Sequence, residues 1–400
     1  MVTASKRRTL DDVCEFIVDC LHKTAPTQEE GYPSIRTPNV GRGRLILDGV
    51  YRVSEDTYQI WTQRAVPEQD DLIMAREAPP GNVAIIKNGH EVCLGQRTVH
   101  LRPDTKQVDP DFLCYYLLAP KQQGALLAGE TGATAGHVNM ADIRRLPVDG
   151  LPPLKVQQKA GKLLAAYDDL LANNARRIRL LEDSARLLYE EWFVRLRFPG
   201  HEHTPIHDGL PKGWQRKVLS DLCQAARETV HPNELEPDTP YIGLEHIPRL
   251  SITLRTWGRA EEVDSTKHRY QTDDILFGKI RPYFHKVGIA LTDGITSSDA
   301  IVIRPAHDEL LPLVLMTTSS DHFVAMASKT AREGSKMPRA DWKLMQQFAV
   351  PLPPMPILKA FNVFITQVLD QLKALTFTNQ KLQQARDLLL PRLMNGEIAV

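Results

Sequence analysis

Several segments contain residue types that carry out catalysis or bind cofactors, but their spacing completes no known motif. The stretches "FGKI" and "AGKL" lack the upstream glycine and the hydroxyl residue of a phosphate-binding loop, and neither G-x-G-x-x-G nor G-x-S-x-G occurs. The Pro-Pro pairs at 79, 152 and 353 follow Ala or Leu, not the Asn or Asp found in amino-methyltransferases. Pro-Asp at 237–238 and Asp-Trp-Lys at 341–343 are too far apart for a nuclease site. The sequence therefore predicts a chain without a catalytic site of its own.

Histidine and cysteine spacing does not favour a metal site. His201, His203 and His207 fall in "FPGHEHTPIHDGLPKGW" (198–214), whose Pro and Gly content is typical of a solvated linker. The five cysteines, at 14, 20, 93, 114 and 223, are odd in number and scattered without C-x-x-C. We expect reduced thiols, with neither a disulfide framework nor a bound metal.

Length and charge limit the classes of protein to consider. A chain of 400 residues is too long for one core, so two or more domains are expected. Its 49 basic and 49 acidic residues cancel, so any binding of nucleic acid would depend on local patches. No apolar run has the roughly 18 residues of a membrane span, and no apolar signal core follows the basic N-terminus. These features predict a cytoplasmic protein that does not contact a membrane.

An internal repeat of about 200 residues organises the sequence. Four pairs of segments occur in the same order: "TLDDVC" (9–14) with "VLSDLC" (218–223), "DDLIMAREAP" (70–79) with "DDILFGKIRP" (273–282), "TVHLRP" (98–103) with "AIVIRP" (300–305), and "LPPL" (151–154) with "LPPM" (352–355). Both copies contain short β-branched runs and a few helical segments, which predicts a mixed α/β (α+β) fold. We expect a first module at 1–150, a spacer helix at 151–197, a linker at 198–214, a second module at 215–352 and a C-terminal spacer helix at 353–400.

Each module is followed by a long stretch of helical pattern. The apolar positions recur mostly at alternating steps of three and four, as in a coiled coil, and each series contains one asparagine, which fixes register. Because a pseudo-twofold relates duplicated units most simply, we expect the two helices to pair antiparallel. The predicted seam residues are Leu163, Tyr167, Leu170, Asn174, Ile178, Leu181, Ala185, Leu188 and Trp192 in the first helix, and Phe361, Ile365, Val368, Leu372, Leu375, Asn379, Leu382, Leu389 and Leu393 in the second.

Three segments resemble a known family. The stretch from "LPPLKVQQKAGKLLAAYDDLL" to "LLYEEWFV" is similar to the central helix of the specificity subunits of Type I restriction–modification systems. "LPKGWQRKVLSDLC" resembles the start of their second target-recognition domain, and "LLLPRLMNGEIAV" resembles their C-terminus. The resemblance covers the whole chain in order, although "TLDDVC" lacks a preceding Leu-Pro-x-Gly-Trp.

The resemblance implies a non-catalytic subunit that recognises a bipartite site in double-stranded DNA. It also implies two methyltransferase subunits and restriction (translocase) subunits as partners, with S-adenosylmethionine, ATP and Mg²⁺ bound by those partners. Two alternatives stay open on the residues alone. One is a self-contained DNA methyltransferase or nuclease of unrecognised type, and the other is a coiled-coil scaffold without DNA binding.

Given this resemblance, residues that could contact DNA are sought at loop tips, since polar side chains read bases and cations bind phosphates. The loop "SIRTPNVGRGRL" and its counterpart "YIGLEHIPRL" are the first candidates for DNA contact, and Gly41 and Gly43 permit close approach of the backbone to the DNA. Glu245 of the second loop could accept from a cytosine amino group, and a surface ion pair is the alternative. For "CLGQRTV" and "ITSSDAI" the alternative is solvation of a strand edge. The remaining candidates follow the Asp-Asp strands or precede the last short helices. The full set is Arg36, Asn39, Arg42, Arg44, Arg76, Gln96, Arg97, His137 and Asn139 in the first module, and Glu245, His246, Arg249, Lys279, Arg281, Tyr283, Lys286, Ser298, Asp299, Lys336 and Arg339 in the second.

Overall fold

The computed structural model describes residues 8–87, 89–128, 136–330 and 337–398. The chain divides into two compact units, one made of residues 1–173 and 380–400 and the other of residues 174–379. The unit boundaries fall inside both long helices, so each unit contains one module and part of each helix. The mixture of strands and helices confirms the predicted fold class.

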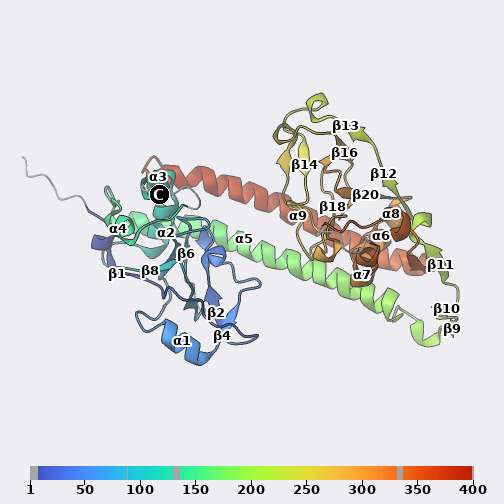
Figure 1. Cartoon of the computed structure of the whole chain (residues 1–400), viewed down its shortest axis with the longest axis horizontal. Helices are drawn as coiled ribbons and strands as arrows, with labels where there is room; N and C mark the ends of the chain where they lie inside the picture. Colours follow the sequence, from blue (N-terminus) through green and yellow to red (C-terminus); the bar gives the residue numbers. More distant parts are fainter. Residues whose placement is uncertain (1–7, 88, 129–135, 331–336, 399–400) are drawn as a thin grey trace, which may run out of the picture. The chain divides into compact units, whose positions relative to one another are not determined.

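The first unit contains two sheets, and the larger one is covered by helix α2 (Figure 1). Its five strands lie in the order β1-β8-β5-β6-β3, and the smaller sheet has the order β4-β2-β7. The strands are β1 Cys14–Asp19, β2 Tyr32–Ile35, β3 Gly43–Arg44, β4 Arg52–Val53, β5 Leu72–Ala75, β6 Val83–Ile85, β7 Cys93–Leu94 and β8 Thr98–Pro103. The helices of this module are α1 Glu55–Trp61, α2 Pro110–Leu118, α3 Pro120–Leu127 and α4 Met140–Arg145.

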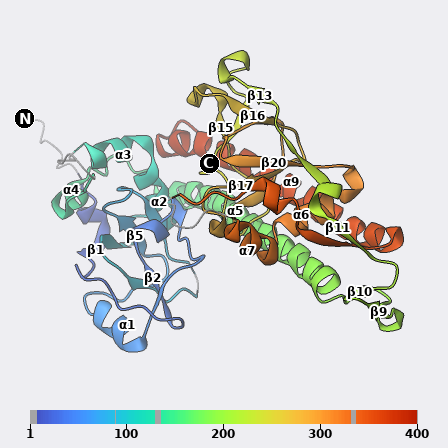
Figure 2. The ribbon, with the colours of Figure 1, turned by 45° about the vertical axis from the view of Figure 1, so that its right-hand side comes forward.

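The second unit repeats this arrangement (Figure 2). A sheet of order β12-β20-β17-β18 corresponds to the first four strands of the larger sheet, and a second sheet has the order β13-β16-β19-β14-β15. The strands are β12 Cys223–Ala226, β13 Thr229–Val230, β14 Pro240–Ile242, β15 Gly258–Arg259, β16 Lys267–Tyr270, β17 Ile275–Gly278, β18 Val287–Ile289, β19 Gly294–Thr296 and β20 Ala300–Pro305. The helices are α6 Leu311–Thr318, α7 Asp321–Lys329 and α8 Trp342–Met345, and strand β11 Gln215–Val218 pairs with β21 Ala349–Leu352.

The strand register confirms the repeat. Cys14 pairs with Pro103 between β1 and β8, and Cys223 pairs with Pro305 between β12 and β20. These four residues are the last residues of the segments matched in sequence, so corresponding residues form corresponding strands in the two copies.

The Asp-Asp and Arg-Pro segments of the repeat are joined by a buried ion pair. In the first module Nε and Nη2 of Arg102 donate to the two carboxylate oxygens of Asp71, at 2.9 and 2.8 Å. In the second module Arg304 contacts Asp274 in the same way, at 2.8 and 2.7 Å. Both carboxylates are almost fully buried, and a bidentate pair offsets their desolvation better than a single contact. This pair explains why both dipeptides recur.

Each Leu-Pro-Pro segment ends the module and starts a long helix. Helix α5 (Leu154–Tyr189) continues into a π-helical turn, Glu190–Val194, and α9 spans Met355–Met394. The carbonyl of Pro153 accepts the first helical bonds of α5, at 2.8 and 3.1 Å, and the carbonyl of Pro354 does the same for α9, at 3.0 and 3.1 Å. Proline suits this position because its fixed φ fits a first turn, in which its missing N–H would have no partner.

Within the second unit the two helices pair antiparallel through the predicted asparagines. Asn174 Nδ2 donates to Asn379 Oδ1 at 2.8 Å. Further along, Phe193 packs edge-on against Phe361, with ring centroids 4.7 Å apart. The seam contact of Asn174 therefore lies in the C-terminal half of α9, and that of Phe193 lies near its start.

The α9 seam is mostly confirmed, whereas part of the α5 seam is wrong. Predicted positions from Phe361 to Leu375 are buried, and Leu382 and Leu389 are half-buried. In α5, Leu163 and Leu170 are 38% and 50% exposed. Asn174, Ile178 and Ala185 are buried as predicted. At five other positions the buried residue lies one place later than predicted, and two of these residues are charged, which an apolar pattern does not reveal: Leu164, Asp168, Glu182, Tyr189 and Phe193. Tyr167, Leu181, Leu188 and Trp192 are half-buried beside it.

Two buried acids on α5 attach the helix to its surroundings. In the first unit Asp168 accepts hydrogen bonds of 2.6 Å from both Tyr115 and Arg386. In the second unit Glu182 Oε1 accepts from Ser251 at 2.7 Å and from the backbone and hydroxyl of Thr253. The helix is therefore bound to each unit by a specific polar contact as well as by apolar packing.

The predicted linker at 198–214 has defined structure. Strands β9 (Ile206–His207) and β10 (Leu210–Pro211) form a hairpin. Phe198 and Trp214, at its two ends, are buried with ring centroids 5.0 Å apart. The Pro and Gly content indicated turns correctly, but the aromatic ends join this segment to the second core.

Among the described residues, no single helix has the length and hydropathy of a membrane span, and one bent pair, 308–318 with 321–329, meets the criterion only when its members are combined. In the structure most residues of α6 in this pair are buried in the second core.

The buried carboxylate of Asp71 leads to a prediction about stability. Burial alone would raise the pKa of Asp71, but the hydrogen bonds from Arg102 and His100 outweigh it and hold the pKa below its ordinary value. Asp71→Ala should lower the free energy of unfolding by about 1–3 kcal/mol at neutral pH, since it removes the acceptor shared by the buried His100 and the half-buried Arg102. The stabilisation is complete above the unfolded-state pKa of about 3.9 and is lost as the pH falls from there through the lower folded-state pKa.

Urea unfolding of the wild type and the variant across pH measures this difference. Asp70→Asn is the matched control, because Asp70 has φ of 69°, which asparagine tolerates. Equal losses in the two variants would contradict the assigned role of Asp71.

Candidate functional site

In the first module, three segments that carry predicted residues meet at the end of β5. The backbone N–H of Arg76 donates to the carbonyl of Arg97 at 2.9 Å, and the N–H of Val138 donates to the carbonyl of Arg76 at 3.1 Å. The side chain of Arg76 donates to His137 Nε2 at 2.7 Å, so Nδ1 of that ring carries the proton it donates to Glu77 at 2.9 Å. Glu77 also forms an ion pair of 3.0 Å with Arg97.

In the second module the equivalent segments meet in the same way at the end of β17. The N–H of Lys279 donates to the carbonyl of Asp299 at 2.9 Å, and the N–H of Ala340 donates to the carbonyl of Lys279 at 2.8 Å. The Lys279 ammonium donates to the carbonyl of Ser298. Arg339 forms an ion pair of 3.4 Å with Asp299.

We call these two arrangements the first and second junctions. Their backbone hydrogen bonds are the same, but their side chains differ. Arg97 of the first corresponds to Asp299 of the second, so a cation stands where the copy has a carboxylate. His137 corresponds similarly to Arg339. A shared backbone with different polar side chains can present two different hydrogen-bonding patterns to two ligands of the same shape.

The predicted loop "SIRTPNVGRGRL" is used largely within the chain. Asn39 caps a short helical turn, accepting from the N–H of Arg36 at 3.1 Å and donating to the carbonyl of Ile46 at 3.1 Å. Arg42 donates to the carbonyl of Leu118 at 3.1 Å, and its side chain is exposed. Arg36 is also exposed, with its guanidinium 5.6 Å from the ring centre of Tyr51.

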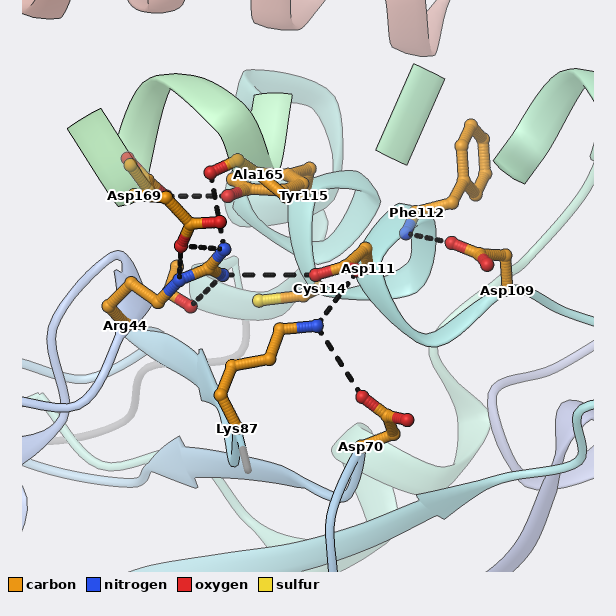
Figure 3. A network of polar contacts seen from close by, with 12 residues as sticks. Arg44, Asp70, Lys87, Asp109, Asp111, Phe112, Cys114, Tyr115, Ala165 and Asp169 are labelled. Atoms are coloured by element: carbon orange, nitrogen blue, oxygen red, sulfur yellow. Dashed lines mark hydrogen bonds and ion pairs between the residues drawn. The ribbon is translucent and has the colours of Figure 1, made fainter. Parts of the chain in front are cut away.

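Arg44 faces helix α5 (Figure 3). The Arg44 guanidinium donates to Asp169 at 3.0 and 2.8 Å and to the carbonyl of Ala165 at 3.2 Å. Gly43 has φ of 102°, and a Cβ there would lie 2.1 Å from Asp168. The close approach predicted for this glycine is therefore made by a helix carboxylate of the same chain, and Arg44 has a structural role that its loop position did not indicate.

In the second module, residues of "YIGLEHIPRL" and "KIRPYFHK" form a cluster of cations and aromatic rings. The guanidinium of Arg249 lies 3.9 Å from the ring centre of Phe284, and that of Arg281 lies 5.9 Å from it. Tyr283, which is exposed, packs edge-on against the same ring at 4.9 Å. Exposed cations held by aromatic rings suit contact with a phosphate backbone.

The other predicted residues lie apart from this cluster or contribute to local structure. His246 Nδ1 accepts from the N–H of Gly243 at 3.0 Å, and Glu245 is exposed. Lys286 donates to the carbonyl of Leu244. Gln96 accepts from Thr24 at 3.4 Å, and Asn139 is exposed near Asp142. Lys336 lies outside the described residues.

Sequence reasoning missed two contributors to these sites. Glu77 contacts both Arg97 and His137 of the first junction, and its only sequence signal was its position between Arg76 and the following Pro-Pro pair. Phe284 supports two arginines, although only its neighbour Tyr283 was selected from "KIRPYFHK". Within the described residues, no group of three or more His, Cys, Asp and Glu side chains could hold a metal ion.

Comparison with known proteins identifies the class to which this geometry belongs. The model of the Type I restriction modification DNA specificity domain matches the chain twice, over residues 4–183 and 211–386. The chain therefore belongs to this family, and its two modules are target-recognition domains of a DNA sequence-recognition subunit.

Individual relatives extend over most of the chain. The Type I restriction enzyme MjaIX specificity subunit of Methanocaldococcus jannaschii is 22% identical over 89% of this chain and 83% of its own length. The HindI specificity subunit of Haemophilus influenzae is 18% identical over 84% and 88%. The crystal structure of the Type I restriction–modification S subunit from M. genitalium has the same fold, with a TM-score of 0.60, 16% identity and 98% of both chains covered.

Proposed function

We propose that each module reads one half of a bipartite DNA site through its junction. The observation that carries this proposal is the identical backbone hydrogen bonding of the two junctions beneath different side chains. Arg97 is 58% exposed at its side chain and can donate two hydrogen bonds to guanine. Asp299, in the equivalent place, can accept from the amino group of cytosine. The two half-sites would then differ in sequence although the modules share a fold.

Exposed arginines in both modules are suited to contact the DNA backbone. Arg249 and Arg281 around Phe284 offer guanidinium groups to phosphates beside the second half-site. Exposed Arg36 and Arg42 would do the same in the first module. Such contacts position the protein on the duplex without specifying bases.

The long helices offer surfaces for protein partners. In the first unit Leu163 and Leu170 of α5 are exposed, and in the second unit Leu187 of α5 and Phe364 of α9 are 60% and 39% exposed. Exposed apolar side chains on helices favour helix-to-helix docking. We assign these faces to two methyltransferase subunits, with restriction subunits joining the complex in the cytoplasm. S-adenosylmethionine, ATP and Mg²⁺ would be bound by those partners.

The first test of this function concerns the junctions. Arg97→Ala should relax the methylated motif in one half only, with a loss of roughly 1–3 kcal/mol in discrimination for a lost bidentate contact. Asp299→Ala should relax only the other half. Sequencing of methylated bases in cells that carry each variant shows which half changes, and a change in both halves from either variant would refute independent reading.

The second test concerns catalysis. Purified without partner subunits, the chain should neither transfer methyl groups nor cleave DNA, because its sequence completes no cofactor or nuclease motif. Methylation assays with S-adenosylmethionine and cleavage assays with ATP and Mg²⁺ measure this, with the reconstituted complex as the positive control. Turnover by the lone chain would favour the alternative of a self-contained enzyme.

The third test concerns the gap between the half-sites, which we attribute to the length of the helices. Four residues inserted after Asn174 in α5 and four before Asn379 in α9 would keep the pairing on either side of the insertion. Each helix lengthens by about 6 Å and turns about 40° beyond a full turn. Since DNA rises about 3.4 Å per base pair, the gap in the methylated motif should grow by one or two pairs.

Matched two-residue insertions are the control for this test, because they rotate each helix by about 200° and should abolish assembly. An unchanged gap with full methylation in the four-residue variant would show that the helices do not set the spacing.

A further inference from the structure

A cavity of about 600 Å³ opens beside the second junction. Strands β12, β16 and β20 and the start of α8 contribute its walls. Arg227, Lys279 and Arg339 bring three cations to it, and Trp342 and His268 bring two rings. Its size lies within the range of pockets that bind small organic ligands.

The cavity is electrically positive. Among the described residues that line it, the one acidic side chain is that of Asp341, which accepts from the N–H of Lys343 at 2.9 Å at the start of α8. The pKa of His268 is lowered by its burial and then by the nearby Lys279 and Arg227. The ring is therefore neutral at pH 7, and its Nδ1 is buried without a hydrogen-bond partner in the described structure. A ligand for this site must be anionic and must also offer a polar edge.

In the first junction, the residues that correspond to the cavity cations have hydrogen-bond and ion-pair partners within the chain. Arg76, the counterpart of Lys279, is buried and bonded to His137 and to the carbonyl of Val138. Glu77 neutralises the surrounding charge by contacting His137 and Arg97. In the second junction Ile280 occupies the position of Glu77, so the cations around the cavity lack that carboxylate, and the carboxylate of Asp299 forms an ion pair with one of them, Arg339.

We propose that the cavity takes up one nucleotide of the second half-site, which leaves the base stack when the DNA is bound. Its phosphate lies among the three cations, and its base packs on Trp342 with an edge toward His268. This inference rests on the proposed role of the second junction in reading DNA. A nucleotide combines the required negative charge, planar ring and polar edge, and it fits the volume. Extrusion costs a few kcal/mol of stacking and pairing, and this cost is smaller where the base is already mismatched.

Mismatch scanning with the complex of the full chain and its methyltransferase partners tests the proposal. Single mismatches are placed in turn at each position of both half-sites and their flanks, and the dissociation constants are measured. A mismatch at a pair read in the groove should weaken binding. At one position of the second half-site it should instead tighten binding, by about tenfold, because the pair is already open. The adenines that become methylated can show the same tightening and are identified by methylation mapping.

Two variants connect that position to the cavity. Arg227→Ala removes an exposed cation, and Ala225→Phe fills the cavity from β12. Both should abolish the tightening at the single position and leave the methylated adenines unaffected. Arg259→Ala, an exposed arginine of the same module paired with Glu261, is the matched control and should behave as the wild type.

Two results would overturn the proposal. One is that every mismatch outside the methylated adenines weakens binding in the wild type, and the other is that the tightening persists in both cavity variants. Deoxyadenosine monophosphate alone could also raise the melting temperature of the wild type but not of Arg227→Ala, without any tightening by mismatches. That result would also overturn the proposal, because it would mean that the cavity binds a free nucleotide and not a nucleotide of the DNA. In none of these cases does half-site reading by Asp299 fail, because its motif change is measured separately.

Discussion

The two carboxylate–guanidinium pairs, Asp71 with Arg102 and Asp274 with Arg304, determine where the junction side chains can lie. Each pair joins the start of one central strand to the end of its antiparallel neighbour. Five residues further along the first strand, and five residues earlier on the second, the chain reaches the junction. Because strand pairing between these two points is continuous, the ion pair at one end fixes the register at the other. A slip of one residue would turn every junction side chain to the opposite face.

The sequence alone predicted the parts of this frame that repeat. Co-linear Asp-Asp and Arg-Pro segments located the central strands and aligned Arg97 with Asp299 before any contact was known. Their physical link could not be predicted, since two dipeptides more than 25 residues apart show no sign of facing one another. Helix α9 was well predicted because its seam is apolar. The first half of α5 was shifted by one residue because its seam includes Asp168, whose burial depends on Tyr115 and Arg386.

In the candidate site, too, some features were predictable from the sequence and others appear only in the folded chain. Loop position and side-chain type selected Arg44 as a ligand contact, but only the fold shows Asp169 beside it. Residue type likewise gave no signal for the cavity, because Arg227, His268 and Trp342 come from three separate segments. Alignment of the two copies worked better than residue type, since it finds positions with a common backbone whatever side chains they carry.

The backbone bonds of the junctions have a consequence for how this protein changes over generations. They are made by N–H and C=O groups, and the register is fixed by ion pairs at the far end of the strands, so exposed junction side chains contribute little to folding stability. Substitutions there are close to neutral for the free energy of unfolding, and they accumulate without passing through unfolded intermediates. Under the proposed role of the junctions, new DNA preferences therefore arise by drift at a few surface positions, or by exchange of a whole module, while the helices and cores remain unchanged.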